Sequence, residues 1–249
     1  MKNTFFWGVW MLMPALVCAQ KMQYVSNRTV DGASKPAEAP LRQYTLQECH
    51  TMPLFGEMSK TMDQIEEEIQ FLNVCDQNFN SREEASKFFA DRAWDYLNDG
   101  EQDTACYRFN LAWLLNKKNA EAYWGLGVIC YQKGELTTAE RMLRKGVMID
   151  SSNVGLLVDL ATVDIVHFDE SHDPEELKEC DILLRQAQAL DSTNANVYLK
   201  KALLDYHKGD FEAAWKNCHR VRELDMSLVD FTFMAKLIAQ KPDPLGIFK

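Results

Sequence analysis

Residues 120–153 read AEAYWGLGVICYQKGELTTAERMLRKGVMIDSSN, and this stretch decides the fold. Apolar side chains recur at helical spacing on both sides of the turn Lys133-Gly134-Glu135, which predicts two helices joined by a tight connection. The closing phrase, MIDSSNV at 148–154, returns as LLNKKNA at 114–120 and as ALDSTNA at 189–195. The stretch is therefore one copy of a repeated helical hairpin.

The copies of this hairpin follow one another at a nearly constant interval. When the residue after each closing Asn is taken as a start, units begin at Ala120, Val154 and Ala195, and counting 34 residues back places a first unit at Ser86. The intervals are 34, 34 and 41 residues, and the phrase ELDMSL at 223–228 closes the fourth unit. A fixed period of this length predicts a repeat protein whose units bury each other's apolar faces.

The residue types within the second unit are those of the tetratricopeptide repeat (TPR) family, which the chain resembles. The matching residues are Tyr123, Leu126, Gly127, Ala139, Leu143 and Gly146. The proline that the family has near the end of each unit is missing, and Lys117, Ser151, Ser192 and Met226 stand in its place. The resemblance implies an all-α fold, a right-handed superhelix of about four helix-turn-helix repeats over residues 81–228 with a capping helix at either end.

The third unit is seven residues longer than the 34-residue period, and the surplus lies in HFDESHDPEE at 167–176. Because this insertion falls between the two helices of its unit, we expect a longer loop. Its two His and several carboxylates are possible ligands of a divalent ion, but the His spacing fits no helical face and the Gly turn of a calcium loop is missing. We expect a solvated acidic loop and no metal site.

Flanking helices are predicted on both sides of the repeats. The first, within residues 56–80, has an apolar stripe that we expect to cover the first repeat, and Ser81 with Glu84 predicts the N-cap of the first repeat helix. The stripe consists of Met62, Ile65, Ile69, Leu72 and Phe79. Residues 229–249 predict a C-terminal capping helix and tail, with Pro242 ending the helix.

The N-terminal residues have the layout of a secretory signal peptide over 1–19. Lys2 precedes an apolar run of 13 residues, too short to span a bilayer, and cleavage is expected between Ala19 and Gln20. Acylation of Cys18 is the alternative, although the residues before it depart from a lipoprotein box. We therefore expect an exported bacterial protein, periplasmic or secreted, in which residues 20–55 form an extended tether.

Composition and motifs limit the possible activities. Asp and Glu number 37 against 27 Lys and Arg, for a net charge of −10, which argues against nucleic acids and anionic membranes as partners. The sequence contains no G-x-S-x-G, P-loop, H-E-x-x-H or C-x-x-C motif, so we expect no enzyme, no catalytic residue and no cofactor. Beyond Cys18 there are six cysteines, which we expect as buried thiols, with a Cys49–Cys75 disulfide as the alternative.

The TPR resemblance implies that the first helix of each unit lines a groove for an extended peptide. The groove positions are mostly aromatic or apolar here, and lack the Lys, Asn and Arg set with which some TPR domains clamp a terminal carboxylate. Trp124 is the best contact candidate, since Gly125 beside it would leave room for a ligand side chain. The predicted groove residues are Trp94, Leu97, Trp124, Val128, Tyr131, Thr162, Leu203 and Tyr206. The alternative is that these aromatic residues pack on neighbouring repeats or flanking segments and leave no groove.

These observations predict a non-enzymatic protein–protein interaction scaffold of the bacterial cell envelope that binds an apolar peptide or protein segment. A self-assembling structural subunit that uses its capping helices is the alternative, and a homo-oligomer is compatible with both. An enzyme or metal carrier built on the acidic insertion is a third and weaker hypothesis.

Overall fold

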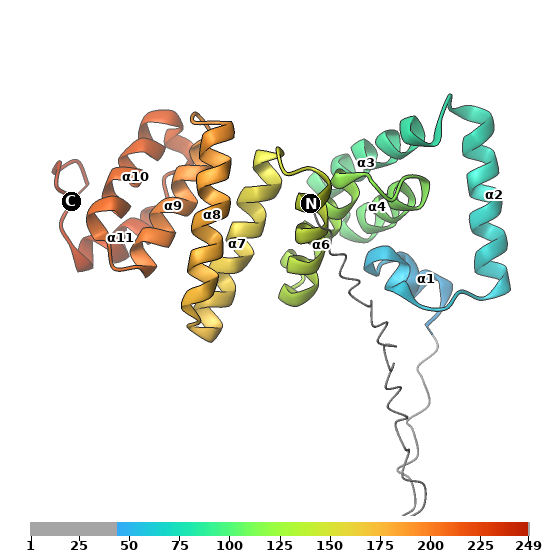
Figure 1. Cartoon of the computed structure of the whole chain (residues 1–249), viewed down its shortest axis with the longest axis horizontal. Helices are drawn as coiled ribbons and strands as arrows, with labels where there is room; N and C mark the ends of the chain where they lie inside the picture. The colour runs from blue at the N-terminus through green and yellow to red at the C-terminus, as the bar shows by residue number, and fades with distance from the viewer. Residues whose placement is uncertain (1–43, 249) are drawn as a thin grey trace, which may run out of the picture. The chain divides into compact units, whose positions relative to one another are not determined.

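The computed structural model describes residues 44–248, and every regular element among them is helical (Figure 1). The expected signal peptide and residues 20–43 of the expected tether lie outside the described residues. None of the described helices is both long and apolar enough to cross a membrane. The elements are α1 (Leu46–His50), η1 (Pro53–Glu57), α2 (Met62–Asn78), α3 (Arg82–Asn98), α4 (Gln102–Leu115), α5 (Ala120–Gln132), α6 (Leu136–Ile149), α7 (Val154–Ser171), α8 (Pro174–Leu190), α9 (Ala195–His207), α10 (Phe211–Leu224), η2 (Met226–Leu228) and α11 (Phe231–Gln240).

Four helical hairpins form the body of the described chain, as predicted. The pairs α3/α4, α5/α6, α7/α8 and α9/α10 each pack closely, and α4, α6 and α8 then contact the first helix of the next pair. The last three pairs begin at Ala120, Val154 and Ala195, the same residues at which the repeated phrase starts its units. The all-α repeat fold is therefore confirmed.

The recurring Asn of the repeated phrase has a structural role as a helix N-cap. The side chains of Asn119, Asn153 and Asn194 each accept a hydrogen bond from a backbone N–H of the helix that follows. The small residue after each turn is equally regular, since Ala105, Ala139, Cys180 and Ala214 are all fully buried between helices. Helix starts and helix contacts are thus specified locally, once in every unit.

The insertion in the third unit lengthens two helices, so the loop that we expected at 167–176 is wrong. Helix α7 has 18 residues and α8 has 17, whereas α5 and α6 have 13 and 14. Only His172 and Asp173 connect them, with His172 in the left-handed region at φ 59° and Asp173 capping α8 ahead of Pro174. Nothing in residues 167–171 breaks a helix, and proline is favourable in the first turn, so both helices extend into the insertion.

The last part of the expected tether is also folded, because residues 46–57 form α1 and η1 against α4. Buried Asn110 of α4 holds this segment: its side-chain oxygen accepts from the Leu54 N–H at 2.8 Å, and its amide donates to the Met52 carbonyl at 2.8 Å and the His50 carbonyl at 3.1 Å. Leu54 is buried in the core of the first repeat. The extended-tether prediction is therefore wrong for these residues.

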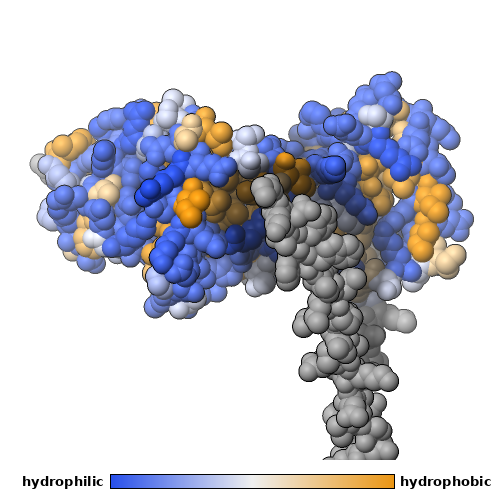
Figure 2. All heavy atoms as spheres, in the orientation of Figure 1, coloured by the Kyte–Doolittle hydropathy of each residue, from blue (hydrophilic) through white to orange (hydrophobic). Residues whose placement is uncertain are grey.

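Only part of the predicted apolar stripe of α2 is buried. Phe71, Leu72, Cys75 and Phe79 pack toward the first repeat, whereas Met62 and Ile69 are 79% and 52% exposed. Figure 2 shows apolar residues at the surface along α2. The expectation that the whole stripe covers the first repeat is wrong for its N-terminal half, since α2 contacts α3 only sparsely and the segment before it takes over the covering role.

Candidate peptide-binding face

The eight predicted groove residues all lie on the first helices of the four hairpins, α3, α5, α7 and α9. None of the eight is fully buried: seven are partly exposed, and Tyr131 is 37% exposed. We call these eight residues the candidate binding face. The structure therefore leaves apolar or aromatic surface on α3, α5 and α9, and the polar Thr162 on α7.

Two tryptophans form the centre of this face and join three repeats. The rings of Trp94 and Trp124 meet edge to face, with centroids 5.0 Å apart. The indole of Trp94 donates to Glu121 Oε2 at 2.9 Å, and that of Trp124 donates to Asp159 Oδ2 at 2.6 Å. Each acceptor belongs to the next repeat, so both rings link neighbouring units as well as lining the face.

Two glycines make space for these rings. A Cβ on Gly155 would lie 2.5 Å from the Trp124 ring, so the absence of a side chain in α7 admits the indole. A Cβ on Gly125 would lie 2.0 Å from the Phe109 ring, so the space beside Gly125 belongs to the core. The interpretation that Gly125 leaves room for a ligand side chain is therefore wrong, and Trp124 is largely committed to packing.

Charged groups lie next to the aromatic centre. Burial raises the pKa of Asp159, and this effect outweighs the hydrogen bond from Trp124 and the attraction of Lys200, which both lower it. Burial also lowers the pKa of Lys200, against the opposing attraction of Asp159. The two side chains come from α7 and α9, so a partly desolvated acid and a partly desolvated base lie on the same side of successive repeats.

Side chains in the C-terminal part of the face already have partners within the chain. The Thr162 hydroxyl donates to the Val158 carbonyl at 2.8 Å, one turn earlier in α7. The ring of Tyr206 packs edge to face on Phe233 of α11, with centroids 5.6 Å apart. Of the predicted residues, the structure thus brings Trp94 and Trp124 into ring contact, whereas Tyr206 packs with the C-terminal helix.

Comparisons with known proteins identify the fold to which these helical hairpins belong. No family model matches the sequence, and no curated protein matches it either. Solved structures that match include a thermophilic TPR protein of Thermus thermophilus, with 16% identity over 64% of this chain and 93% of that one and a TM-score of 0.52. Two others are pilF of Pseudomonas aeruginosa (19% identity, 64% and 70% covered, TM-score 0.53) and MamA (18%, 64% and 83%, TM-score 0.50). The described chain has a TPR fold. At these identities the likeness establishes the fold alone.

Among the described residues, the cysteines are buried and the residue types that bind metals do not cluster. The six cysteines of residues 44–248 all have free, buried thiols, so the alternative Cys49–Cys75 disulfide is not formed. Burial raises the pKa of Cys106, Cys130, Cys180 and Cys218 to about 12, which makes them poor nucleophiles at neutral pH. Within the same residues, no three His, Cys, Asp or Glu side chains are arranged to hold a metal ion.

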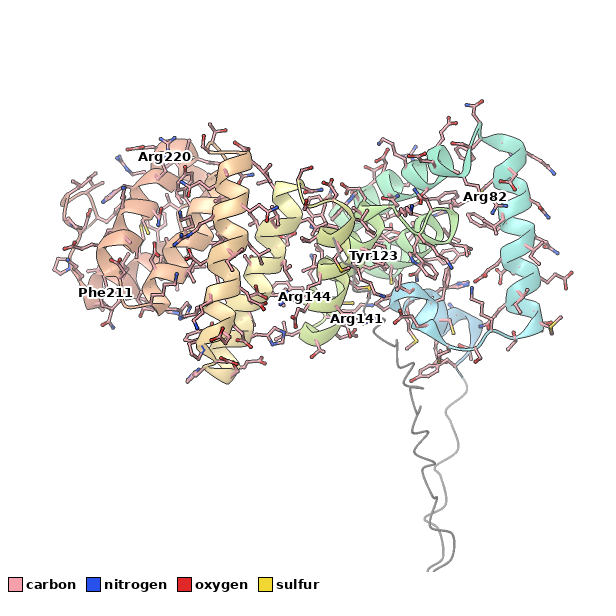
Figure 3. The ribbon with its side chains drawn as sticks, in the orientation of Figure 1. Arg82, Tyr123, Arg141, Arg144, Phe211 and Arg220 are labelled. Carbon is pink, nitrogen blue, oxygen red and sulfur yellow. The ribbon has the colours of Figure 1, made fainter. Side chains whose placement is uncertain are left out.

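A polar pocket that the sequence analysis missed lies between α8, α9 and α10 of the last two TPR units. Its charges compensate one another: Lys208 lies 3.4 Å from Asp181, and Asn217 donates to Asp205 at 2.7 Å. Arg220, labelled in Figure 3, lines the pocket and contacts Glu223. None of the eight predicted residues lines it. Sequence spacing could not find this pocket, because its lining comes from helices of two units and also from Pro244 and Leu245 of the C-terminal tail.

Proposed function

We propose that this protein is a non-enzymatic scaffold of the bacterial cell envelope that holds an apolar peptide or protein segment on the candidate binding face. The observation that carries the proposal is the set of partly exposed apolar and aromatic side chains on α3, α5 and α9, with Thr162 of α7 among them. Monomeric proteins rarely leave such surface without a use. The Trp94–Trp124 pair forms a rigid floor, and the more exposed side chains beside it make the contacts.

Tyr131 is the residue with which to test this face, because it is the most exposed of the eight side chains. We expect Tyr131→Ala to weaken binding about tenfold or more, since exposed aromatic residues at the centre of an interface carry a large share of its energy. Random extended peptides displayed on phage are selected on the purified chain, and affinities of the selected peptides are then measured by calorimetry.

The matched control is Met148→Ala, which removes an apolar side chain that is 85% exposed on α6, outside the candidate binding face. This variant should bind the selected peptides like the wild type. Equal affinity of the Tyr131 variant and the wild type, or a library that yields no binder, would contradict the proposed function.

Export is the second part of the proposal and rests on the signal peptide expected at residues 1–19. Mass spectrometry of the protein recovered from a bacterial envelope fraction should find a chain that begins near Gln20. A lipid on Cys18, or a chain that retains residues 1–19, would contradict it.

A self-assembling subunit is the second candidate function, and one observation favours it. The N-terminal half of α2 presents Met62, Ile65 and Ile69 to solvent, although this stripe has the spacing of a buried helix face. Measurement of molar mass by light scattering during size-exclusion chromatography distinguishes a monomer from an assembly.

A further inference from the structure

The junction between the second and third repeats contains a buried carboxyl group without a full set of partners. Asp164 of α7 is 2% exposed, and its Oδ2 has no hydrogen-bond partner. Its Oδ1 lies 3.8 Å from Arg144 Nη2 of α6, which is too long for a hydrogen bond. An ionised carboxylate in such a place lacks the solvation that it has in water.

Arg144, the one cation near Asp164 in the described chain, is shared with two other carboxylates. Its Nε donates to Glu140 Oε1 at 2.7 Å, and its Nη2 donates to Glu179 of α8. Figure 3 shows Arg144 where α6 faces the third repeat. With all three carboxylates ionised, a single guanidinium faces three negative charges, so the junction carries a net negative charge.

The remaining groups around Asp164 do not neutralise this charge. From α8, Glu176 adds a further carboxylate, and the Cys180 thiol is neutral. His167 of α7 has its Nε2 3.5 Å from Glu140 Oε2, so a proton on that ring would offset Glu140 first.

The other helices that pack on α7 contribute no opposing charge at this point. From α5, Cys130 packs in the same cluster as Leu160 and Val163, and its thiol is also neutral. From α9, His207 faces Asp169, Lys208 faces Asp181, and Lys200 faces Asp159.

We propose that Asp164, together with the carboxylates that share Arg144, forms a proton-sensitive joint between the second and third repeats. Uptake of one proton removes the uncompensated buried charge and tightens the contact of α7 with α6 and α8. Release of the proton restores the charge and loosens that contact. The Trp124–Asp159 hydrogen bond crosses the same junction, so the joint also governs how firmly the two central repeats of the candidate binding face are held together.

The direction of the pH effect follows from the environment of Asp164. Burial first, and then Glu179 and Glu140, raise its pKa from 3.8 to about 7, against the opposing effect of Arg144. A carboxyl group whose pKa is higher in the folded than in the unfolded chain stabilises the fold fully below about pH 4, and this contribution is lost as the pH rises through about 7.

The test compares the melting temperatures of the full-length wild type and Asp164→Asn at pH 5.5 and pH 8. The amide has the shape of the protonated acid and cannot ionise. The melting temperature of the variant minus that of the wild type should be about 5 °C higher at pH 8 than at pH 5.5. Glu170→Gln, which removes an exposed carboxylate of the same helix, should show no such pH-dependent difference.

If the melting temperatures of Asp164→Asn and the wild type differ by the same amount at both pH values, the proposal is overturned. Glu140→Gln provides an independent arm: it removes one competing carboxylate and frees Arg144, so the midpoint of the pH effect should move to lower pH. If the Asp164 variant does not fold, the carboxyl ¹³C signal of Asp164 is titrated in the wild type. A midpoint near 7 supports the joint, and a midpoint below 5 contradicts it.

Discussion

The two ends of the repeat array are closed in different ways. At the C-terminal end, α11 buries Phe233, Met234 and Leu237 against the last repeat, in the usual manner of an amphipathic helix. At the N-terminal end, α2 buries less, and the segment at 46–57 is held on α4 by three hydrogen bonds with the Asn110 side chain, which donates two and accepts one. One end is closed by an apolar helix face, and the other by apolar side chains together with backbone groups bound to one buried amide.

This difference indicates which kind of cap can be predicted from a sequence. Helix α11 has apolar residues at helical spacing, and this pattern predicts the helix. It predicts the buried face only in part, because Phe231 is 65% exposed whereas Phe233 is buried. The N-terminal segment has no periodicity, and Leu54, Phe55 and Glu57 adopt left-handed backbone angles that cost about 1–2 kcal/mol each. Such a conformation persists because tertiary contacts compensate for its cost, so local sequence rules predict against it.

The largest effect is expected at the C-terminal end, for Trp215→Ala. The Trp215 ring is buried beneath the tail, and its indole donates to the Lys241 carbonyl at 2.9 Å. We expect a loss of about 3–5 kcal/mol in the free energy of unfolding, measured by urea denaturation with circular dichroism. The control, Phe231→Ala, removes an exposed ring of α11 and should leave stability nearly unchanged. Equal losses for both variants would show that side-chain burial does not close this end.

A smaller effect is expected at the N-terminal end, for Asn110→Ala. The change leaves the Leu54 N–H and the His50 carbonyl without their side-chain partner, while the Met52 carbonyl keeps the hydrogen bond from the Phe55 N–H, and we expect a cost of about 1–3 kcal/mol. Limited proteolysis should then cut the chain within residues 44–61 faster than in the wild type, while the four hairpins stay protected. Unchanged proteolysis would mean that Leu54 and its apolar contacts hold this segment without the amide.

The smallest effect is expected on the exposed side of α2, for Ile69→Lys. Because this side chain lies mostly in solvent, the free energy of unfolding should change by less than about 0.5 kcal/mol. If the protein assembles through α2, the same substitution should reduce the molar mass found by light scattering. A strong loss of stability in a monomer would instead show that the stripe packs within the chain.

The sequence could predict part of the candidate binding face. Family positions placed Trp94 and Trp124 on the first helices, where the structure also has them. The hydrogen bonds of their indoles to Glu121 and Asp159 could not be predicted, because each acceptor lies about one unit further along the chain and depends on how neighbouring repeats pack. The polar pocket and the Asp164 junction were missed for the same reason.

By itself the sequence determined the features that repeat in every unit. The capping Asn, the buried small residue after the turn and the apolar spacing act over a few residues, so helix starts and the pairing of helices follow from local rules. Only the tertiary structure decided that residues 46–57 fold onto α4 and that α2 leaves the N-terminal half of its stripe exposed. Each of these depends on contacts between segments distant in the chain, whose free energies outweigh the local preferences of the residues involved.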